Sequence, residues 1–266
     1  MKKSLIILIL LILTFALINC VVAVVDYSTP SKEISLGEFN RLLPFKPGGS
    51  LSVRNIQGEV AVYGWDRNEV ELRAVRRLRE SSRTVRFMSW KAVSPDIQVD
   101  RFGDSISIST KRRGRDDYFP FVDYELKVPQ AIIIDGIFVQ NGDIFVYDCF
   151  GEILLETGRG NIEVDNFSGS MKATVGIGAI STWLFDLRPE DEINLFVEEG
   201  NINIYLQEGV QAQIKAFAEK GEIISDFDLG EELPLQTFSG KIGEEEGASI
   251  TLNSRNGNIY IGKIKE

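Results

Sequence analysis

The stretch from Asn141 to Leu184 decides the fold. It reads NGDIFVYDC FGEILLETG RGNIEVDNF SGSMKATVG IGAISTWL. A glycine recurs every nine residues, and aliphatic side chains mostly follow two and four places after it, with polar residues between them. This alternation is typical of a half-buried strand, and glycine turns the chain at a strand end without a Cβ penalty. The glycines are Gly142, Gly151, Gly160, Gly169 and Gly178.

One such strand cannot bury its apolar face alone, but strands repeated at a fixed period can stack, as in a solenoid. After Phe185 the spacing loosens and the signature persists, as Gly200-Asn-Ile, Gly221-Glu-Ile, Gly240-Lys-Ile and Gly257-Asn-Ile. We therefore predict an all-β solenoid whose turns follow one another in sequence order. Its interior ladder is predicted to consist of Ile144, Ile162, Ile180, Ile202 and Ile223.

Composition narrows the classes of function. The chain has 266 residues, 44% of them hydrophobic, which is enough for one sizeable core or one long solenoid. A net charge of −10 argues against nucleic acid as the main partner. Histidine is absent, which removes the usual general base and the commonest metal ligand. The two cysteines, Cys20 and Cys149, cannot form a zinc knuckle or a disulfide framework. We expect no enzyme, and no catalytic, cofactor-binding or metal-binding residues.

Residues 1–25 are predicted to be a signal peptide, a lipoprotein signal or a membrane anchor. Two lysines precede an apolar run from Leu5 to Val25, the order found in export signals. Leu17-Ile-Asn-Cys20 resembles a lipoprotein signal with Cys20 as the lipidated residue, although Asn19 departs from the usual small residue. Cleavage after Ala23 would instead release a soluble protein, and an uncleaved run of about 21 residues could span a bilayer. Each alternative places the rest of the chain outside the cytoplasmic membrane.

Two further regions are predicted. Residues 26–49 carry Pro30, Pro44 and Pro47 with little periodicity, which favours a linker or an irregular cap. Residues 50–266 form the β domain. Its early strands are predicted within 50–75 with turns at 55–58 and 64–68, then at 96–99, 105–110, 122–128 and 131–139. Later ones are predicted at 193–197, 210–217 and 249–253. Leu51, Val53, Val60, Val62, Val70 and Leu72 should point inward.

Four stretches together resemble the bacterial putative-adhesin family, a domain of unknown function with β-solenoid repeats. They are Val60-Ala-Val-Tyr-Gly-Trp-Asp-Arg-Asn-Glu-Val, Val122-Asp-Tyr-Glu-Leu-Lys-Val-Pro129, the Gly-Asn-Ile repeats from Asn141, and Ser249-Ile-Thr-Leu-Asn-Ser-Arg-Asn-Gly-Asn-Ile-Tyr-Ile261. The resemblance covers residues 50 to 263 and implies a single-stranded, right-handed β-helix in a bacterial cell envelope. No catalytic motif accompanies the family, so the resemblance implies no site residue.

Charge is distributed unevenly along the sequence. Residues 73–115 hold twelve basic side chains against Glu80, Asp96, Asp100 and Asp104, whereas residues 189–246 hold fifteen carboxylates against three lysines. If sequence order is kept in space, this makes an electric dipole with a basic part that could lie near an anionic membrane leaflet. The alternative is a set of solvated faces with internal ion pairs, each of which contributes little stability.

The outward aromatics Phe145, Tyr147, Tyr205 and Tyr260 could bind sugar or protein, or could simply contact one another on a sheet face. Glu244-Glu245-Glu246 is interpreted as a solvated turn rather than a calcium site. Gly176-Ile-Gly178 is interpreted as a strand turn rather than a dinucleotide loop. Cys149 is predicted to be a small, partly buried core residue without the positive neighbours of a reactive thiol.

Three functions remain open at this level. The first is a non-enzymatic, membrane-tethered scaffold or adhesive surface of the cell envelope, with a protein or polysaccharide ligand on the solenoid face. The second is an envelope-stress sensor or regulator acting through a membrane-protein partner. The third is a polysaccharide-active enzyme, since stacked β-helices also carry such activities. That chemistry needs carboxylates and Lys or Arg side chains that converge on one face. The outward acids at 143, 152, 163 and 165 instead belong to a regular repeat, and no departure from it marks a cleft.

Overall fold

A computed structural model describes residues 33–46, 48–79, 95–111, 120–230 and 234–264. The described residues are all-β: they form nineteen strands and no helix. The predicted signal or anchor segment 1–25, with the lipidation candidate Cys20, lies outside the described residues. Within the described part of the chain, no helix offers an apolar length sufficient to cross a membrane.

The strands match the predicted ones closely, and every residue predicted to point inward within 51–72 is fully buried. The bounds are β1 (Glu33–Pro44), β2 (Ser50–Gln57), β3 (Val60–Trp65), β4 (Glu69–Arg79), β5 (Asp96–Phe102), β6 (Ser105–Lys111), β7 (Phe121–Pro129), β8 (Ala131–Asn141), β9 (Ile144–Tyr147), β10 (Phe150–Arg159), β11 (Ile162–Ile177), β12 (Ile180–Leu184), β13 (Glu192–Glu199), β14 (Ile202–Leu206), β15 (Ala212–Ala218), β16 (Ile223–Ser225), β17 (Thr237–Ile242), β18 (Ala248–Asn256) and β19 (Ile259–Lys263).

The strands pair in two series, which we call sheet A and sheet B. Sheet A has the order β1-β4-β7-β3-β9-β11-β12-β14-β19-β16. Sheet B has the order β5-β6-β2-β8-β10-β11-β13-β18-β15-β17. The long strand β11 belongs to both, because its first half pairs with β9 and β12 and its second half pairs with β10 and β13. We call a strand of sheet B together with the strand of sheet A that follows it a rung.

The core lies between the two sheets and consists of aliphatic ladders. Parallel pairing places Ile162 beside both Ile144 and Ile180, and places Ile202 beside Ile180. These side chains are fully buried. The predicted ladder is therefore confirmed over these four residues, but Ile259 lies between Ile202 and Ile223. Burying such a side chain contributes about 1.5–3 kcal/mol against a backbone ordering cost of about 1–2 kcal/mol per residue, so the ladder is stable only as a whole.

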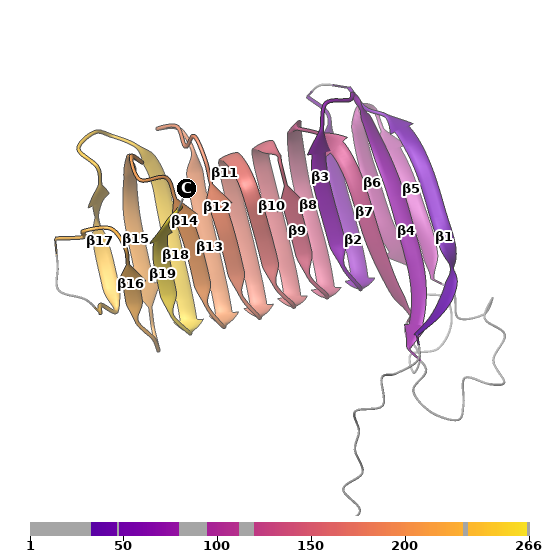
Figure 1. Cartoon of the computed structure of the whole chain (residues 1–266). Coiled ribbons are helices and arrows are strands. Elements are labelled where there is room, and N and C mark those ends of the chain that lie inside the picture. Colours follow the sequence, from indigo (N-terminus) through magenta and orange to yellow (C-terminus); the bar gives the residue numbers. More distant parts are fainter. Residues whose placement is uncertain (1–32, 47, 80–94, 112–119, 231–233, 265–266) are drawn as a thin grey trace, which may run out of the picture. The chain divides into compact units, whose positions relative to one another are not determined.

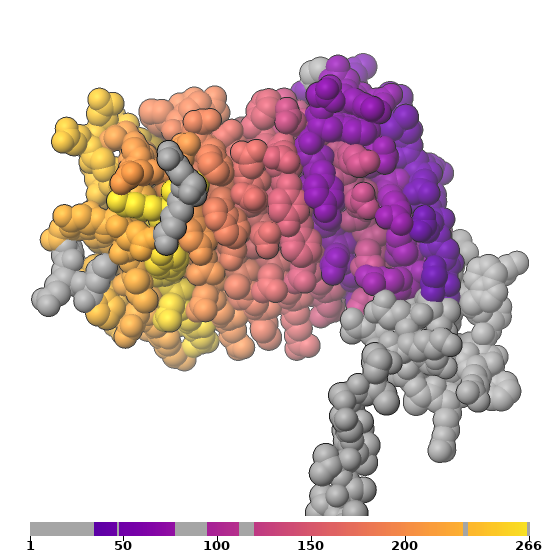
Figure 2. Space-filling model, viewed as in Figure 1, coloured from indigo at the N-terminus to yellow at the C-terminus, as the bar shows by residue number. Residues whose placement is uncertain are grey.

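Spatial order departs from sequence order near both ends of the stack, and the prediction that they coincide is wrong. The rung β2–β3 lies between β6–β7 and β8–β9. The rung β18–β19 lies between β13–β14 and β15–β16. Both insertions are visible in Figure 1, and Figure 2 shows yellow atoms of the last strands among orange ones. At these two places, the position of a strand in the sequence does not give its position in the stack.

Antiparallel strands occupy three of the four outer positions of the two sheets, and the parallel strand β16 occupies the fourth. β1 pairs antiparallel with β4 in sheet A, while β5 and β17 pair antiparallel with β6 and β15 in sheet B. Residues 33–44, predicted to belong to a linker or irregular cap, thus form a twelve-residue strand. The weak periodicity has a structural reason, because a register shift between Ser35 and Gly37 interrupts the alternation. Such terminal strands protect the parallel edges from pairing with another chain.

One corner of the stack is a column of glycines followed by polar side chains. Gly160 has a φ of 142°, and a Cβ at this position would overlap the carbonyl oxygen of Gly142 in the neighbouring rung. The next residue, Asn161, accepts a hydrogen bond through Oδ1 from the backbone N–H of Ala179, at 2.9 Å. Asp143 accepts in the same way from the N–H of Asn161, at 2.6 Å. The repeated Gly-Asn and Gly-Asp pairs therefore satisfy backbone donors where the chain turns between sheets.

Thr182 is the exception in the buried core. Its side chain is fully buried on β12 between Val164 and Ile204, and its Oγ1 has no hydrogen-bond partner within the described residues. Since an unpaired buried hydroxyl costs about 1–3 kcal/mol, Thr182→Val should raise the free energy of unfolding by about 1 kcal/mol. Urea denaturation followed by circular dichroism measures this change.

Thr157→Val is the matched control. Thr157 is equally buried, but its hydroxyl donates to the carbonyl oxygen of Gly142 at 2.8 Å. This variant should lower the free energy of unfolding by about 1 kcal/mol because it leaves that acceptor unpaired. A shift of the same sign in both variants would contradict the assignment of Thr182 as an unsatisfied group.

Candidate functional site on the outer face of sheet A

The outer face of sheet A carries a row of aromatic rings on successive rungs. Register places Tyr63 beside Tyr147, and Tyr147 beside Asp165. Further along, Trp183 lies beside Tyr205. The row is built by the period of two in each strand, which directs alternate side chains outward at aligned positions.

The rings stack on one another in two groups. Tyr63 and Tyr147 have ring centroids 5.4 Å apart and planes inclined by 17°. Trp183 and Tyr205 have centroids 4.8 Å apart and planes inclined by 7°. Tyr260 contacts Tyr205 edge-on at 5.7 Å. Aromatic pairs of this kind contribute about 0.5–1.5 kcal/mol beyond their buried area, so much of the row stabilises the sheet itself.

The sequence-predicted strip is thus only partly correct. Phe145 stacks with Tyr147 at 6.3 Å, and Tyr205 contacts Tyr260, but these two pairs belong to separate groups. The predicted strip lacks Tyr63 and Trp183, which supply the shortest ring-to-ring distance in each group. Both occupy outward positions of alternating strands, so the alternation was a usable signal. Their partners could be found only from the register.

Between the two aromatic groups, strand β11 presents Glu163 and Asp165. The hydroxyl of Tyr147 donates to Oε1 of Glu163 at 2.9 Å. The pKa of Tyr147 is raised, mainly by burial and then by the hydrogen bond to Glu163 and by the nearby negative charges of Glu163 and Asp165. Tyr147 therefore stays neutral and remains a hydrogen-bond donor throughout the physiological pH range.

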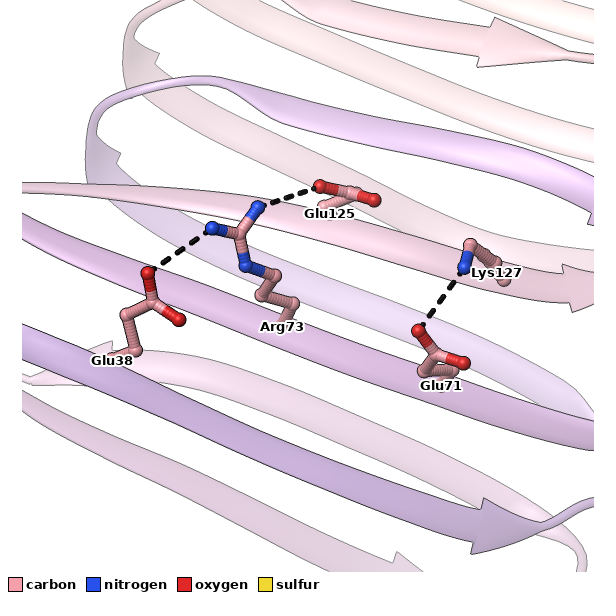
Figure 3. A network of polar contacts seen from close by, with 5 residues as sticks. All are labelled: Glu38, Glu71, Arg73, Glu125 and Lys127. Carbon is pink, nitrogen blue, oxygen red and sulfur yellow. Dashed lines mark hydrogen bonds and ion pairs between the residues drawn. The ribbon is translucent and has the colours of Figure 1, made fainter.

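At the end of sheet A formed by β1, β4 and β7, charged side chains neutralise one another (Figure 3). Arg73 on β4 bonds Glu38 on β1 and Glu125 on β7, both at 3.1 Å. Lys127 bonds Glu71 at 3.2 Å, and Arg77 pairs with Asp123. Arg73 and Arg77 of β4 are therefore paired with carboxylates that are distant in sequence. These contacts are the internal ion pairs that the sequence offered as the alternative to a dipole.

An open hollow of about 340 Å³ adjoins this network, and its lining includes Glu59, Tyr63, Arg73 and Arg77. Burial raises the pKa of Glu59, the carboxylates of Asp123 and Asp143 raise it further, and Arg77 opposes the rise. The hollow holds both signs of charge in contact with each other. This balance gives it little preference for an ionic ligand.

The other candidates have structural roles. Glu244, Glu245 and Glu246 are exposed in the connection from β17 to β18. Residues 176–178 form the end of β11 and the turn to β12, as predicted. No group of three or more acidic or cysteine side chains is placed to hold a metal ion within the described ranges.

Cys149 is a free thiol in the core, as predicted, but it is fully rather than partly buried. Its pKa is raised to about 12, first by burial and then by the charge of Asp148. Because the thiolate is the reactive form, Cys149 should resist iodoacetamide at pH 8 in the folded protein and react once the protein is unfolded in urea. Mass spectrometry of the peptide that contains Cys149 measures the modified fraction. Equal rates in the folded and unfolded states would contradict this expectation.

Comparisons with known proteins support the fold. A solved structure described as a "putative cell adhesion protein" from Clostridium sporogenes is similar to this chain at 12% identity with a TM-score of 0.51, covering 86% of this chain and 100% of that one. A "putative adhesin" from Bacteroides fragilis matches at 10% identity with a TM-score of 0.34, covering 86% of this chain and 97% of that one. The first match shows a shared fold, and the second supports no further conclusion. No protein-family model and no curated protein matches the sequence.

Proposed function

We propose that the chain is a non-enzymatic, adhesin-like binding protein of the bacterial cell envelope, built as a single-stranded β-helix and tethered to a membrane by its N-terminal segment. The observation that carries the proposal is the outer face of sheet A, where two groups of aromatic rings lie on either side of the acidic side chains of β11. A face of this composition suits recognition of another molecule, because aromatic side chains supply rigid contact area and carboxylates supply directional hydrogen bonds.

Three further observations support the proposal. The parallel register joins residues eighteen apart, such as Ile144 and Ile162, as expected for two strands per turn of a β-helix. The fold is shared with the Clostridium sporogenes structure described as a "putative cell adhesion protein". The titratable groups with the clearest pKa shifts, Cys149 and Tyr147, are both held in their neutral forms, which suits contact better than nucleophilic chemistry.

Site-specific photo-crosslinking of the full-length protein in its native envelope tests the binding face. A photoreactive residue replaces Asn203, which lies on the outer face of sheet A, or Thr251, which is exposed on the outer face of sheet B. We expect a crosslinked partner from position 203 and little from position 251. Equal capture from both positions, or none from position 203, would refute binding through sheet A.

Whether the partner is soluble or membrane-embedded separates adhesion from envelope-stress regulation. A crosslinked product that contains a transmembrane protein encoded beside the gene for this chain would favour the role of an envelope-stress regulator. A surface ligand or polysaccharide would favour adhesion. For the tether, Cys20→Ala should leave an unlipidated precursor of higher mass, and an unchanged mass and membrane fractionation would remove the lipoprotein alternative.

A further inference from the structure

The strongest unexplained feature is the gap in the aromatic row. Tyr147 stacks on Tyr63 through one ring face, and Trp183 stacks on Tyr205 through one ring face. Register places β11 between β9, which carries Tyr147, and β12, which carries Trp183. Since adjacent strands lie about 4.8 Å apart, the backbones of β9 and β12 lie about 9.5 Å apart on either side of β11. We call the surface formed by Tyr147, Glu163, Asp165 and Trp183 the slot.

A β-bulge shapes the base of the slot. The register between β11 and β12 shifts after Val164, so that Asp165 and Asn166 together lie opposite Trp183. Asn166 has a φ of 52°, and its backbone N–H donates to Oδ1 of Asp165 at 2.8 Å. Bulges that reorient a side chain are frequent beside functional sites. Here the bulge and the hydrogen bond hold the Asp165 carboxylate in one orientation.

The carboxylates of the slot lack basic partners. Two other acids on the same sheet face each have one: Glu125 pairs with Arg73, and Glu71 pairs with Lys127. For Glu163 and Asp165, the described residues supply a phenol and a backbone N–H but no basic side chain. Two adjacent negative charges without a cation are unfavourable, and an external cation would relieve them.

The polar atoms of the slot that remain free are hydrogen-bond acceptors. Each carboxylate keeps one oxygen that is not used by the bonds above. On the next two rungs, Asn203 donates through Nδ2 to Oγ of Ser181 at 3.2 Å, which leaves the Asn203 carbonyl oxygen as an acceptor. A complementary ligand is therefore positively charged, rich in N–H donors and able to contact aromatic faces.

We propose that the slot binds the guanidinium group of an arginine side chain presented by a partner protein. A guanidinium held by the carboxylates of β11 would lie about one strand spacing, roughly 4.8 Å, from each of the strands that carry Tyr147 and Trp183, and cation–π attraction extends to roughly 6 Å. Its N–H donors match carboxylate oxygens in bidentate geometry, whereas a lysine ammonium stacks less well and a quaternary ammonium cannot donate. This inference rests on the proposed function and names the chemistry of its ligand.

Titration of the full-length protein in neutral-lipid nanodiscs tests the slot. The probes are acetyl-Gly-Arg-Gly-amide, the lysine tripeptide and the citrulline tripeptide, in which an uncharged urea of the same shape replaces guanidinium. Tryptophan fluorescence follows binding, and Trp183→Phe identifies the signal from the slot. We expect a Kd of about 1 mM for the arginine peptide, several-fold weaker binding of lysine, and at least about 10-fold weaker binding of citrulline.

Charge-matched variants separate the slot from general electrostatic attraction. The pair Glu163→Gln and Asp165→Asn should weaken binding of the arginine peptide at least about 10-fold. The pair Glu244→Gln and Glu245→Gln removes the same charge from an exposed turn and should change the affinity less than about twofold. Unchanged thermal unfolding of both variants shows that the fold is retained.

Several results would overturn the inference. They are equal binding of arginine and citrulline peptides, equal binding of arginine and lysine peptides, or equal losses in the two charge-matched variants. If these occur while a photoreactive residue at position 203 still captures a partner, the arginine assignment fails and the proposed function stands. If position 203 captures nothing, the proposed function itself fails.

Discussion

Truncation of the chain after Glu246 is expected to abolish cooperative folding, although it removes only the last strands in sequence. The lost segment includes β18 and β19, which pair on both sides: β18 with β13 and β15, and β19 with β14 and β16. Their removal exposes parallel edges and apolar surface inside the stack, including the partners of Ile250, Leu252 and Ile259. A chain stacked in sequence order would lose only a terminal rung. Urea denaturation and size-exclusion chromatography should show aggregation and no cooperative transition.

Complementation provides the control for this truncation. A synthetic peptide of residues 247–266, added during refolding, should restore the cooperative transition because it supplies the missing rung. The same peptide with Ile259→Asp should not, since Ile259 is fully buried between Ile202 and Ile223. A truncated chain that unfolds cooperatively near the wild-type urea midpoint would contradict the internal position of β18–β19.

Gly160→Ala is expected to lower the free energy of unfolding by about 3 kcal/mol or more. The φ of 142° lies in a region that side chains rarely adopt, which alone costs about 1–3 kcal/mol. The added methyl group would also overlap the carbonyl oxygen of Gly142, forcing neighbouring rungs apart. Because the backbone on both sides is held in ladders, relaxation is limited. Urea denaturation monitored by circular dichroism measures the loss.

Gly209→Ala is the matched control for this substitution. Gly209 lies in the turn between β14 and β15, and a Cβ there would meet no atom within 4 Å. The same change of residue should leave stability unchanged or raise it by up to about 1 kcal/mol, because alanine restricts the unfolded chain. Similar losses at positions 160 and 209 would show that the glycine corner tolerates side chains and that its tight packing is not required.

The sequence by itself determined most of the strands after β1 and many of the residues that face the core. Alternation identified the inward positions of β2 and β3, and the nine-residue glycine period identified the turns at Gly142, Gly160 and Gly178. These features depend on each residue and its near neighbours: strand geometry repeats every two residues, and a turn at positive φ selects glycine. For the same reason, Cys149 was recognised as a core residue from its place in the repeat.

Tertiary structure alone decided the order of the rungs and the composition of the candidate site. Each rung offers nearly the same backbone edges and apolar ladder, so the local sequence does not distinguish Ile223 from Ile259 as the neighbour of Ile202. That choice depends on hydrogen bonds and packing between segments far apart in the chain. The pairing of Arg73 with Glu38 and Glu125 has the same origin. The slot between Tyr147 and Trp183 likewise exists only because the register aligns three strands.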